Sequence, residues 1–289
     1  MNKDVAISVA VLLTVHNRRE QTTNCLRTVF AQIMPDTLQL DVFMVDDGST
    51  DGTADSVKSL FPKVNIVEGD GSLYWNRGMH RAWEVASQKK DYNYYLWLND
   101  DTVLESYAIK ELLNLSAQYA DATIVVGATK SSKGDKLTYG GRRGTQIVPC
   151  DGNPHEVERF NGNIVLVPQS VFRIIGNLDY YYTHSKGDFD YGIRAGKVGI
   201  KMYQCGQVLG VCDEHECIDS WCDPTIPLCK RWDLMHKPTG MPPNETFHYE
   251  KQINIWMAVF HFCTVYLRCL FPKVWIDRDK HKQTHIVEK

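Results

Sequence analysis

The sequence lacks a Cys-x-x-Cys pair, an internal repeat, a low-complexity tract and any apolar run long enough to be a clear membrane span. Its nine cysteines are an odd number and are scattered through 289 residues, so a disulfide scaffold is not expected. This cysteine usage favours free thiols in a reducing, cytoplasmic compartment. Five cysteines lie between residues 205 and 229, but their spacing does not favour a structural zinc site.

The chain also lacks a strong charge of either sign. Its formal net charge of −3 gives no general electrostatic reason to bind nucleic acid, which is therefore not expected as a partner. Residues 5–15 are apolar, but they do not favour a signal peptide, because the preceding residues are weakly charged and no small-residue cleavage site follows. A hydrophobic content of 43% is ordinary for a globular protein.

Apolar segments of strand length alternate with amphipathic segments of helical period along much of the chain. Strands are expected at 5–14, 40–45, 64–67, 94–98, 123–128 and 160–167, and helices near 26–33, 53–60, 79–89 and 105–120. This alternation predicts right-handed crossovers, and hence an α/β fold with a mostly parallel central sheet flanked by helices.

Polar clusters follow three of these strands, at the strand ends where open α/β sheets bind their ligands. They are residues 14–18, residues 46–53 and the Asn99-Asp100-Asp101 triplet. Two adjacent aspartates suit a hard divalent cation that also contacts a substrate phosphate. Alternatively, the two aspartates cap the helix expected at 105–120, and the triplet alone does not decide between these interpretations.

Two other segments carry groups suited to chemistry. Residues 68–78 are rich in glycine and contain Arg77 near the start of a helix, which suits an anion such as a diphosphate, although an ordinary loop has the same composition. In the segment 185–194, Ser185 and Asp188 have the spacing of a capping box. Asp190 and Arg194 have the spacing of an i,i+4 ion pair.

The character of the sequence changes near residue 236. Residues 241–245 have the composition of a linker, and the aromatic and aliphatic segment 249–271 that follows is interrupted by three basic residues. This segment is too polar to span a bilayer. It is expected either to pack as a helix on the rest of the protein or, with its cationic flanks, to rest on an anionic membrane surface through residues 250–271.

Taken in order, the segments Thr14–Arg18, Val45–Thr53, Leu98–Asp101 and Gly187–Asp190 resemble the motifs of family 2 glycosyltransferases, which share the GT-A fold. The resemblance covers residues 5–215, and the Asp-Asp-Gly-Ser-Thr-Asp-Gly-Thr run is its most specific part. Residues 71–78 and 237–249 further resemble the branch that contains bacterial rhamnosyltransferases of surface-polysaccharide synthesis. The resemblance implies a GT-A catalytic domain over 1–235 and a C-terminal helical extension with a polar tail over 236–289.

The resemblance also implies a role for each matched residue. The nucleotide would be bound by Asp47 with Thr14, His16, Asn17 and Arg18, and Asp46 would support their loop. Asn76 and Arg77 would lie near the nucleotide or its diphosphate. Asp101 would hold a Mg²⁺ or Mn²⁺ ion, Asp100 would contact the ribose or the sugar, and Asp188 would be the catalytic base. His215 is either a second metal ligand or a surface or core histidine. The family more often has glutamate where this chain has Gly187.

The implied reaction is the inverting transfer of a sugar from a nucleotide-diphosphate donor, dTDP-rhamnose or a UDP-sugar, to a hydroxyl of a glycan or lipid-linked acceptor. The alternatives are a sugar nucleotidyltransferase and an inactive nucleotide-sugar-binding module. A nucleotidyltransferase would usually carry a glycine-rich loop after its first strand, where this chain has His16-Asn17-Arg18. The presence of Asp101 and Asp188 argues against an inactive module. The expected location is cytoplasmic, with peripheral contact at the inner face of the plasma membrane as a further possibility.

Overall fold

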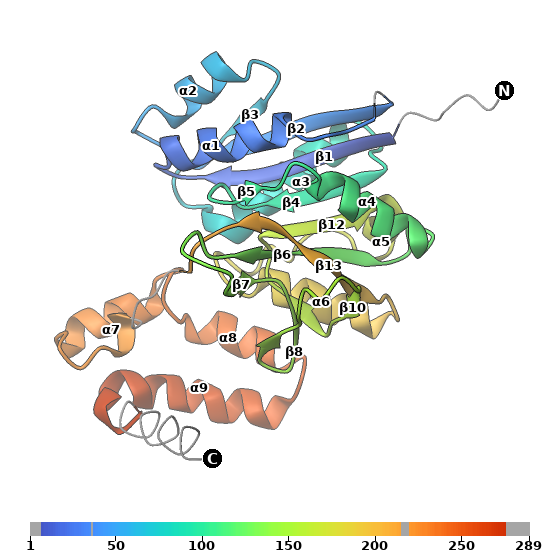
Figure 1. Ribbon diagram of the computed structural model, residues 1–289. Coiled ribbons are helices and arrows are strands. Elements are labelled where there is room, and N and C mark those ends of the chain that lie inside the picture. The colour runs from blue at the N-terminus through green and yellow to red at the C-terminus, as the bar shows by residue number, and fades with distance from the viewer. Residues whose placement is uncertain (1–6, 36, 215–219, 276–289) are drawn as a thin grey trace. The chain divides into compact units, whose positions relative to one another are not determined.

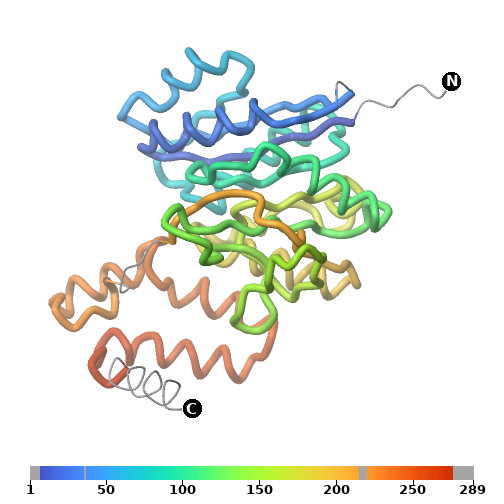
Figure 2. The backbone as a smooth tube through the Cα atoms, viewed as in Figure 1, coloured from blue at the N-terminus to red at the C-terminus, as the bar shows by residue number. Residues whose placement is uncertain are grey.

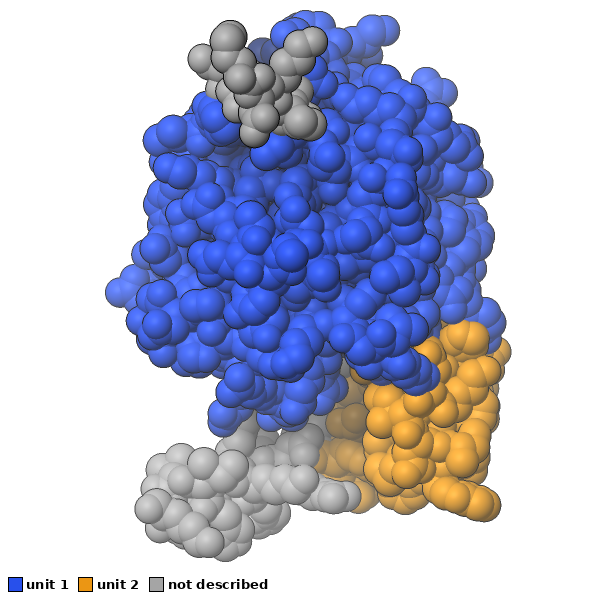
Figure 3. Space-filling model, turned by 90° about the vertical axis from the view of Figure 1, so that its right-hand side faces the viewer, with its two compact units in different colours: residues 1–214 blue, residues 215–289 orange. Residues whose placement is uncertain are grey.

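The computed structural model describes residues 7–35, 37–214 and 220–275. The chain forms two compact units, residues 1–214 and residues 215–289, which Figure 3 distinguishes by colour. The first unit ends before the domain boundary that we predict at 235/236. The reason is that α7 (Leu228–His236) packs against α9 (Ile255–Leu270) within the second unit.

The first unit is built on one large sheet, and its order confirms the predicted α/β fold with a mostly parallel centre (Figure 1). Four neighbouring strands run parallel in the order β3 (Asn65–Glu68), β2 (Leu38–Asp46), β1 (Ile7–Val15) and β4 (Tyr94–Leu98). Beyond them, β12 (Ile164–Pro168) is antiparallel to both β4 and β6 (Ile124–Lys130). The long β13 (Met202–Val211) returns from late in the chain to lie parallel to β6, as the tube in Figure 2 shows.

Helices cover both faces of this sheet, so the central strands are apolar on both sides, as parallel strands generally are. One face packs on α3 (Tyr74–Lys89), α5 (Gln169–Ile175) and α6 (Gly187–Lys197), around the buried rings of Trp83, Trp97 and Tyr191. The other packs on α1 (Arg19–Phe30), α2 (Thr53–Leu60) and α4 (Ala108–Gln118). Successive residues of β1 alternate between the two cores, as the pleat requires.

Short strands complete the first unit, and two of them correct the sequence-based boundaries. They are β5 (Val103–Leu104), β7 (Leu137–Tyr139), β8 (Gly141–Arg143), β9 (Gln146–Ile147), β10 (His155–Glu156) and β11 (Arg159–Phe160). The single strand expected at 160–167 is divided into β11 and β12, because the chain turns at residues 161–163. The helix expected at 105–120 begins only at Ala108, after β5.

The second unit is helical over its described residues, with the one-turn η1 (Ser220–Cys222), α7, α8 (Pro243–Glu250) and α9 around a small core that contains Trp221 and Met235. The linker expected at 241–245 is wrong in its second half, since Pro243 opens α8, and proline is favoured in the first turn of a helix. The long apolar segment 249–271 is divided between α8 and α9. No helix among the described residues is long and apolar enough to cross a membrane.

Candidate functional site

The polar clusters predicted from the sequence meet at one edge of the sheet. Val15 is in register with Asp46, so the loops that follow β1 and β2 leave the sheet side by side. Leu98 at the end of β4 faces Ile164 at the start of β12, which brings Asn99 against the turn at residues 161–163. This is the edge where parallel α/β sheets bind their ligands.

Hydrogen bonds tie together the two loops expected to hold a nucleotide. His16 Nδ1 lies 2.6 Å from the carbonyl oxygen of Asp47, and the Asn17 side chain accepts from the Thr50 backbone N–H at 2.7 Å. Asn17 adopts a left-handed backbone conformation with φ of 51°, which asparagine tolerates better than most residues. The carboxylate of Asp46 accepts from the Ser49 N–H at 2.9 Å and so supports the loop. His16 and Asn17 are exposed, so their side chains are accessible to a ligand.

Asp47, in contrast, is buried and already engaged by the protein. One of its carboxylate oxygens accepts from the Gly71 N–H at 2.8 Å, and the other accepts from the N–H groups of Leu73 and Tyr74 at 3.0 and 2.8 Å. Three charge-assisted bonds of this kind fix the loop that leads into α3. The side chain of Thr14 lies under the same helix, where a Cβ on Gly78 would collide with its hydroxyl.

Asn76 and Arg77 hold a second loop, residues 179–183. The Asn76 amide donates to the carbonyl oxygens of Asp179 and Tyr182 at 2.8 and 2.7 Å, and the side chain is fully buried. Arg77 donates from Nε to the Tyr180 carbonyl at 3.2 Å, with its guanidinium carbon 4.9 Å from the Tyr180 ring centre. In this structure Asn76 therefore joins α3 to the 179–183 loop, and of the pair only Arg77 is partly exposed.

The two aspartates after β4 share one arginine. A guanidinium nitrogen of Arg18 lies 2.7 Å from Asp101 Oδ2 and 3.4 Å from Asp100 Oδ1. Burial raises the pKa of Asp100 to about 7; the neighbouring charge of Asp101 adds to the rise, and Arg18 opposes it. Neither aspartate caps α4, whose N-terminal flanking residue is Tyr107 without a side-chain cap, so the capping interpretation is wrong.

These carboxylates fit a hard cation. Mg²⁺ and Mn²⁺ prefer oxygen ligands, and Mg²⁺ is commonly held by one or two carboxylates together with substrate phosphates. The described residues contain no group of three or more histidine, cysteine, aspartate or glutamate side chains placed to hold a metal alone, so water and substrate would have to complete the coordination. The thiol of Cys212 lies 3.4 Å from Asp101 Oδ1. His215, predicted as a possible second metal ligand, lies outside the described residues.

Asp188 lies in the first turn of α6 and is partly buried. Its Oδ2 accepts from the Gly162 N–H at 3.0 Å and its Oδ1 from the Phe189 N–H at 2.8 Å. Burial raises the pKa of Asp188 to about 6, against the lowering effect of these backbone bonds. A carboxylate of this kind is a stronger base than an ordinary aspartate.

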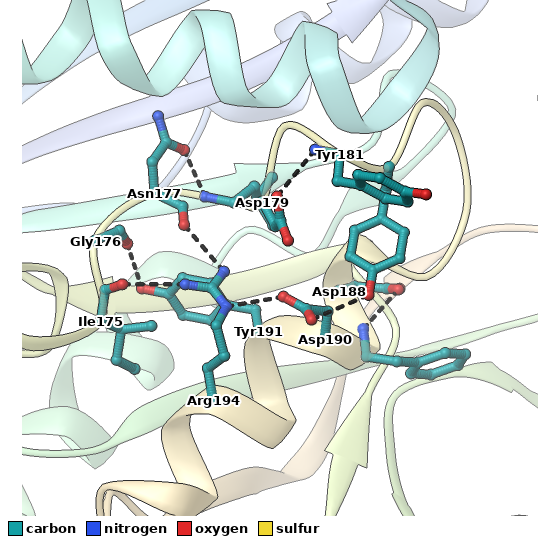
Figure 4. Close-up of polar contacts among 12 residues, drawn as sticks. Ile175, Gly176, Asn177, Asp179, Tyr181, Asp188, Asp190, Tyr191 and Arg194 are labelled. Atoms are coloured by element: carbon teal, nitrogen blue, oxygen red, sulfur yellow. Dashed lines mark hydrogen bonds and ion pairs between the residues drawn. The ribbon is translucent and has the colours of Figure 1, made fainter. Parts of the chain in front are cut away.

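The rest of α6 anchors this turn. Arg194 pairs with Asp190 at 2.8 Å, which confirms the predicted ion pair, and Arg194 also donates to the carbonyl oxygens of Ile175 and Asn177 at 3.0 Å each (Figure 4). The predicted capping box is wrong. The helix is flanked by Lys186 in a left-handed conformation, and no side chain caps it.

Trp75 and Gly162 connect the two acidic parts of the site, and the sequence did not reveal this link. Trp75 Nε1 donates to Asn99 Oδ1 at 2.8 Å. The ring covers Gly162 so closely that a Cβ there would lie 2.5 Å from it, and the Gly162 N–H binds Asp188. The Asn99–Asp101 turn and the Asp188 carboxylate are thus held in one continuous set of contacts.

His184 is a second residue that the sequence did not single out. Its ring lies edge-on to the ring of Tyr74, with 6.1 Å between their centres, and its Nδ1 is buried without a hydrogen-bond partner. Burial lowers the pKa of His184, and the positive charge of Arg18 lowers it further. A lone histidine in a loop carries no signal in sequence, so only the fold shows that it lies near Arg18.

The sheet order and the acidic edge define an α/β protein of the GT-A class. The model of the family described as glycosyl transferase family 2 matches residues 10–179, and the chain belongs to this family. The comparison with curated proteins gives no match.

Several solved structures have the same fold at low sequence identity. The S. aureus protein TarS is 12% identical with a TM-score of 0.56, over 86% of this chain and 43% of TarS. TarS 1-349 in complex with UDP-GlcNAc is 14% identical with a TM-score of 0.54, over 86% of this chain and 72% of that one. GalNAc-T7 with UDP, GalNAc and Mn²⁺ is 12% identical with a TM-score of 0.53, over 81% of this chain and 48% of that one. The chain thus matches less than half of full-length TarS, and at these identities the likeness shows the fold alone.

Proposed function

We propose that this family 2 glycosyltransferase is metal-dependent and inverting, and that it transfers a sugar from dTDP-rhamnose or a UDP-sugar to a hydroxyl of a glycan or lipid-linked acceptor. Support for a nucleotide-sugar donor comes from family membership and from structures of the same fold that were solved with UDP-GlcNAc or with UDP and Mn²⁺. The rhamnosyl donor and a role in bacterial surface-polysaccharide synthesis rest on the sequence resemblance in residues 71–78 and 237–249.

The observation that carries this proposal is the linked pair of acidic sites at the sheet edge. Asp188 is the proposed general base, which accepts the proton of the acceptor hydroxyl as that oxygen attacks the anomeric carbon. Its raised pKa of about 6 leaves it mostly ionised at neutral pH, yet more basic than an ordinary aspartate. A single displacement of this kind inverts the anomeric centre, and no dedicated nucleophile for a retaining mechanism stands out in the sequence.

On the donor side, Asp101 is the proposed metal ligand and Asp100 the contact to the ribose or sugar. When bound, the Mg²⁺ or Mn²⁺ ion supplies positive charge where the diphosphate leaving group becomes more negative. Arg18, which pairs with both aspartates, places a further cation beside this position. The exposed His16 and Asn17 are proposed to contact the nucleotide, and the buried Asp47 to act by shaping the loop that starts α3.

The proposed acceptor places the enzyme in the cytoplasm, at the inner face of the plasma membrane. Contact with the bilayer is proposed through residues 250–271. A lipid-linked acceptor lies in that plane, so surface attachment would raise the rate of encounter between enzyme and acceptor.

The test is release of nucleoside diphosphate by the purified full chain with Mn²⁺ and either dTDP-rhamnose or UDP-sugars. Asp188→Asn should lower the rate by roughly 10²- to 10⁴-fold, the usual contribution of a general base. The matched control is Asp135→Asn, a carboxylate that is 97% exposed, and it should leave the rate unchanged.

The pH dependence adds a second readout of the same assignment. Only ionised Asp188 can accept a proton, so its protonation should lower the wild-type rate roughly tenfold for each pH unit below the pKa of about 6. Asp100, whose pKa is about 7, should give both enzymes an acid decline of its own, so the decline of Asp188→Asn should be shallower than that of the wild type. Full activity of that variant, or an acid decline as steep as that of the wild type, would remove Asp188 as the base.

A further inference from the structure

Helix α9 presents its large apolar side chains outward. Trp256 is 80% exposed and Phe260 is 59% exposed, and these two recur with Cys263 and Leu267 every three or four residues, which places them on one face of the helix. We call this the outward face. Its exposed members are Trp256, Met257, Val259, Phe260, Cys263, Leu267, Leu270 and Phe271.

The opposite side of α9 packs within the second unit. It does so through the small buried side chains of Ala258, Val265 and Cys269 and the half-buried rings of Phe262 and Tyr266. His261 Nδ1 lies 2.9 Å from a carboxylate oxygen of Glu250, and the guanidinium of Arg268 lies 6.0 Å from the ring centre of Trp221. A surface helix of a globular protein normally exposes charged and polar residues, whereas the outward face of α9 exposes large apolar ones. A contiguous exposed apolar surface of this kind marks an interaction site.

We propose that the outward face binds the surface of an anionic lipid bilayer, with α9 lying in the plane of the interface. The outward face contains no charged residue, and the segment around it is basic. Residues 251–275 contain three basic residues, Lys251, Arg268 and Lys273, and no aspartate or glutamate, whereas the whole chain has a net charge of −3. An exposed apolar face on a segment of positive charge is the combination that suits anionic headgroups over an apolar interior.

Two other occupants fit the same face less well. A second copy packed symmetrically through α9 would bring two basic segments together, and like charges across an interface oppose association. The chain's own residues 276–289 contain only three aliphatic side chains, Ile276, Ile286 and Val287, too few to cover eight apolar residues. This inference rests on the membrane contact in the proposed function, which it assigns to one face of α9 and to anionic lipid. Its observations come from the second unit alone, so its test is separate from the test of glycosyl transfer.

The experiment is flotation of the full chain with vesicles of phosphatidylcholine containing 30 mol% phosphatidylglycerol, compared with pure phosphatidylcholine. The protein should float with the anionic vesicles, and added salt should weaken binding because the charges are exposed. The double variant Trp256→Glu/Phe260→Glu removes two large apolar contacts from the outward face and should lower the partition coefficient by roughly a hundredfold. Both side chains are exposed, so the fold should survive, which circular dichroism and thermal unfolding would check.

The matched control is Ile33→Glu/Ile174→Glu, two side chains of the first unit that are each 63% exposed, and it should bind vesicles like the wild type. Failure of the wild type to float with anionic vesicles would overturn the proposal, as would flotation that the α9 variant leaves unchanged. A dimer in sedimentation analysis that only the α9 variant dissociates, without vesicle binding, would assign the outward face to a second copy instead. Loss of transferase activity in solution would bear on the proposed function and not on this surface.

Discussion

At the scale of single residues, Trp75 links the Asn99–Asp101 turn to the segment that holds the Asp188 carboxylate. Its indole N–H binds Asn99, immediately before the two aspartates, and its ring lies on Gly162, whose N–H binds Asp188. The ring of Trp97 meets it edge-on at 6.5 Å and limits its movement. Trp75 is therefore a positioning residue, and a small displacement of its ring would shift both the Asn99–Asp101 turn and the Asp188 carboxylate.

Trp75→Phe tests this role because the smaller ring lacks both the donor to Asn99 and the outer ring atoms that lie on Gly162. The lost hydrogen bond and the lost packing should together cost about 1–3 kcal/mol of unfolding free energy. A slight misplacement of catalytic groups costs up to roughly a hundredfold in rate, so kcat should fall by about ten- to a hundredfold while the KM for the donor changes less. Steady-state kinetics and urea unfolding measure the two effects.

The matched control is Trp232→Phe, the same substitution at a ring of α7 that is 41% exposed, and it should change neither kcat nor KM. A Trp75→Phe enzyme that is less stable but has an unchanged kcat would show that Trp75 only supports the fold.

The residues that the sequence could single out as candidates were those with a local signature. Asp100, Asp101 and Asp188 stand out because each belongs to a short acidic motif at a strand or helix end, and the Asp190–Arg194 pair follows from helical spacing alone. The roles of Trp75, Gly162 and His184 had no such signature. They depend on contacts between residues distant in sequence, such as Trp75 with Asn99 and Gly162 with Asp188, and no local pattern encodes these.

At the scale of elements, the start of α6 depends on the absence of a side chain at Gly187. A Cβ at this position would collide with the side-chain oxygen of Asn76. Asn76 cannot move aside easily, because its amide nitrogen donates to two carbonyl oxygens of the 179–183 loop and the residue is fully buried. The departure from the more common glutamate thus has a physical reason: α3 and α6 approach closely through Gly187, next to Asp188.

Gly187→Ala should therefore be destabilising by about 1–3 kcal/mol, the usual cost of overpacking, and should lower activity by displacing Asp188. Gly196→Ala, in the same helix, is the matched control. Nothing lies within 4 Å of a Cβ at Gly196, so alanine there should stabilise the protein by about 0.4–1 kcal/mol through the unfolded state. Urea unfolding of both variants gives the comparison. Equal stability of the two would show that α6 tolerates a side chain at its start.

Elements with strong periodicity could be predicted and those set by packing could not. The apolar runs of β1, β2 and β4 are continuous because helices cover both faces, so their existence follows from composition. The division of 160–167 into β11 and β12 occurs instead at the turn of residues 161–163, where the Trp75 ring lies on Gly162. At Pro243 the Pro-Pro pair suggested a break, whereas the second proline begins a helix.

At the scale of the whole molecule, charge and chemistry are distributed unevenly along the chain. The acidic and histidine-bearing loops gather at one sheet edge of the first unit, since parallel strands direct their carboxyl ends the same way. The exposed apolar side chains of α9 belong to the second unit, where residues 251–275 contain three basic residues and no acidic one. The sequence could predict the α/β class and the position of the acidic loops, whereas the outward face of α9 required knowledge of which helical residues are buried.

Ligand-linked stability tests the donor side of the site on the intact chain. A ligand that binds only the folded state should stabilise the protein by about 2.7 kcal/mol at a hundredfold excess over its Kd, so thermal unfolding with a panel of dTDP- and UDP-sugars should single out the donor. Mn²⁺ and the donor together should raise the Tm by more than the sum of their separate effects, because carboxylate and diphosphate oxygens would share one cation. Asp101→Asn should abolish this excess and retain part of the shift from the nucleotide alone, whereas Asp135→Asn, on the exposed surface, should retain both. If Asp101→Asn keeps the full combined shift, the cation binds elsewhere; if no nucleotide sugar shifts the Tm of the wild type, the sheet edge is not a donor site.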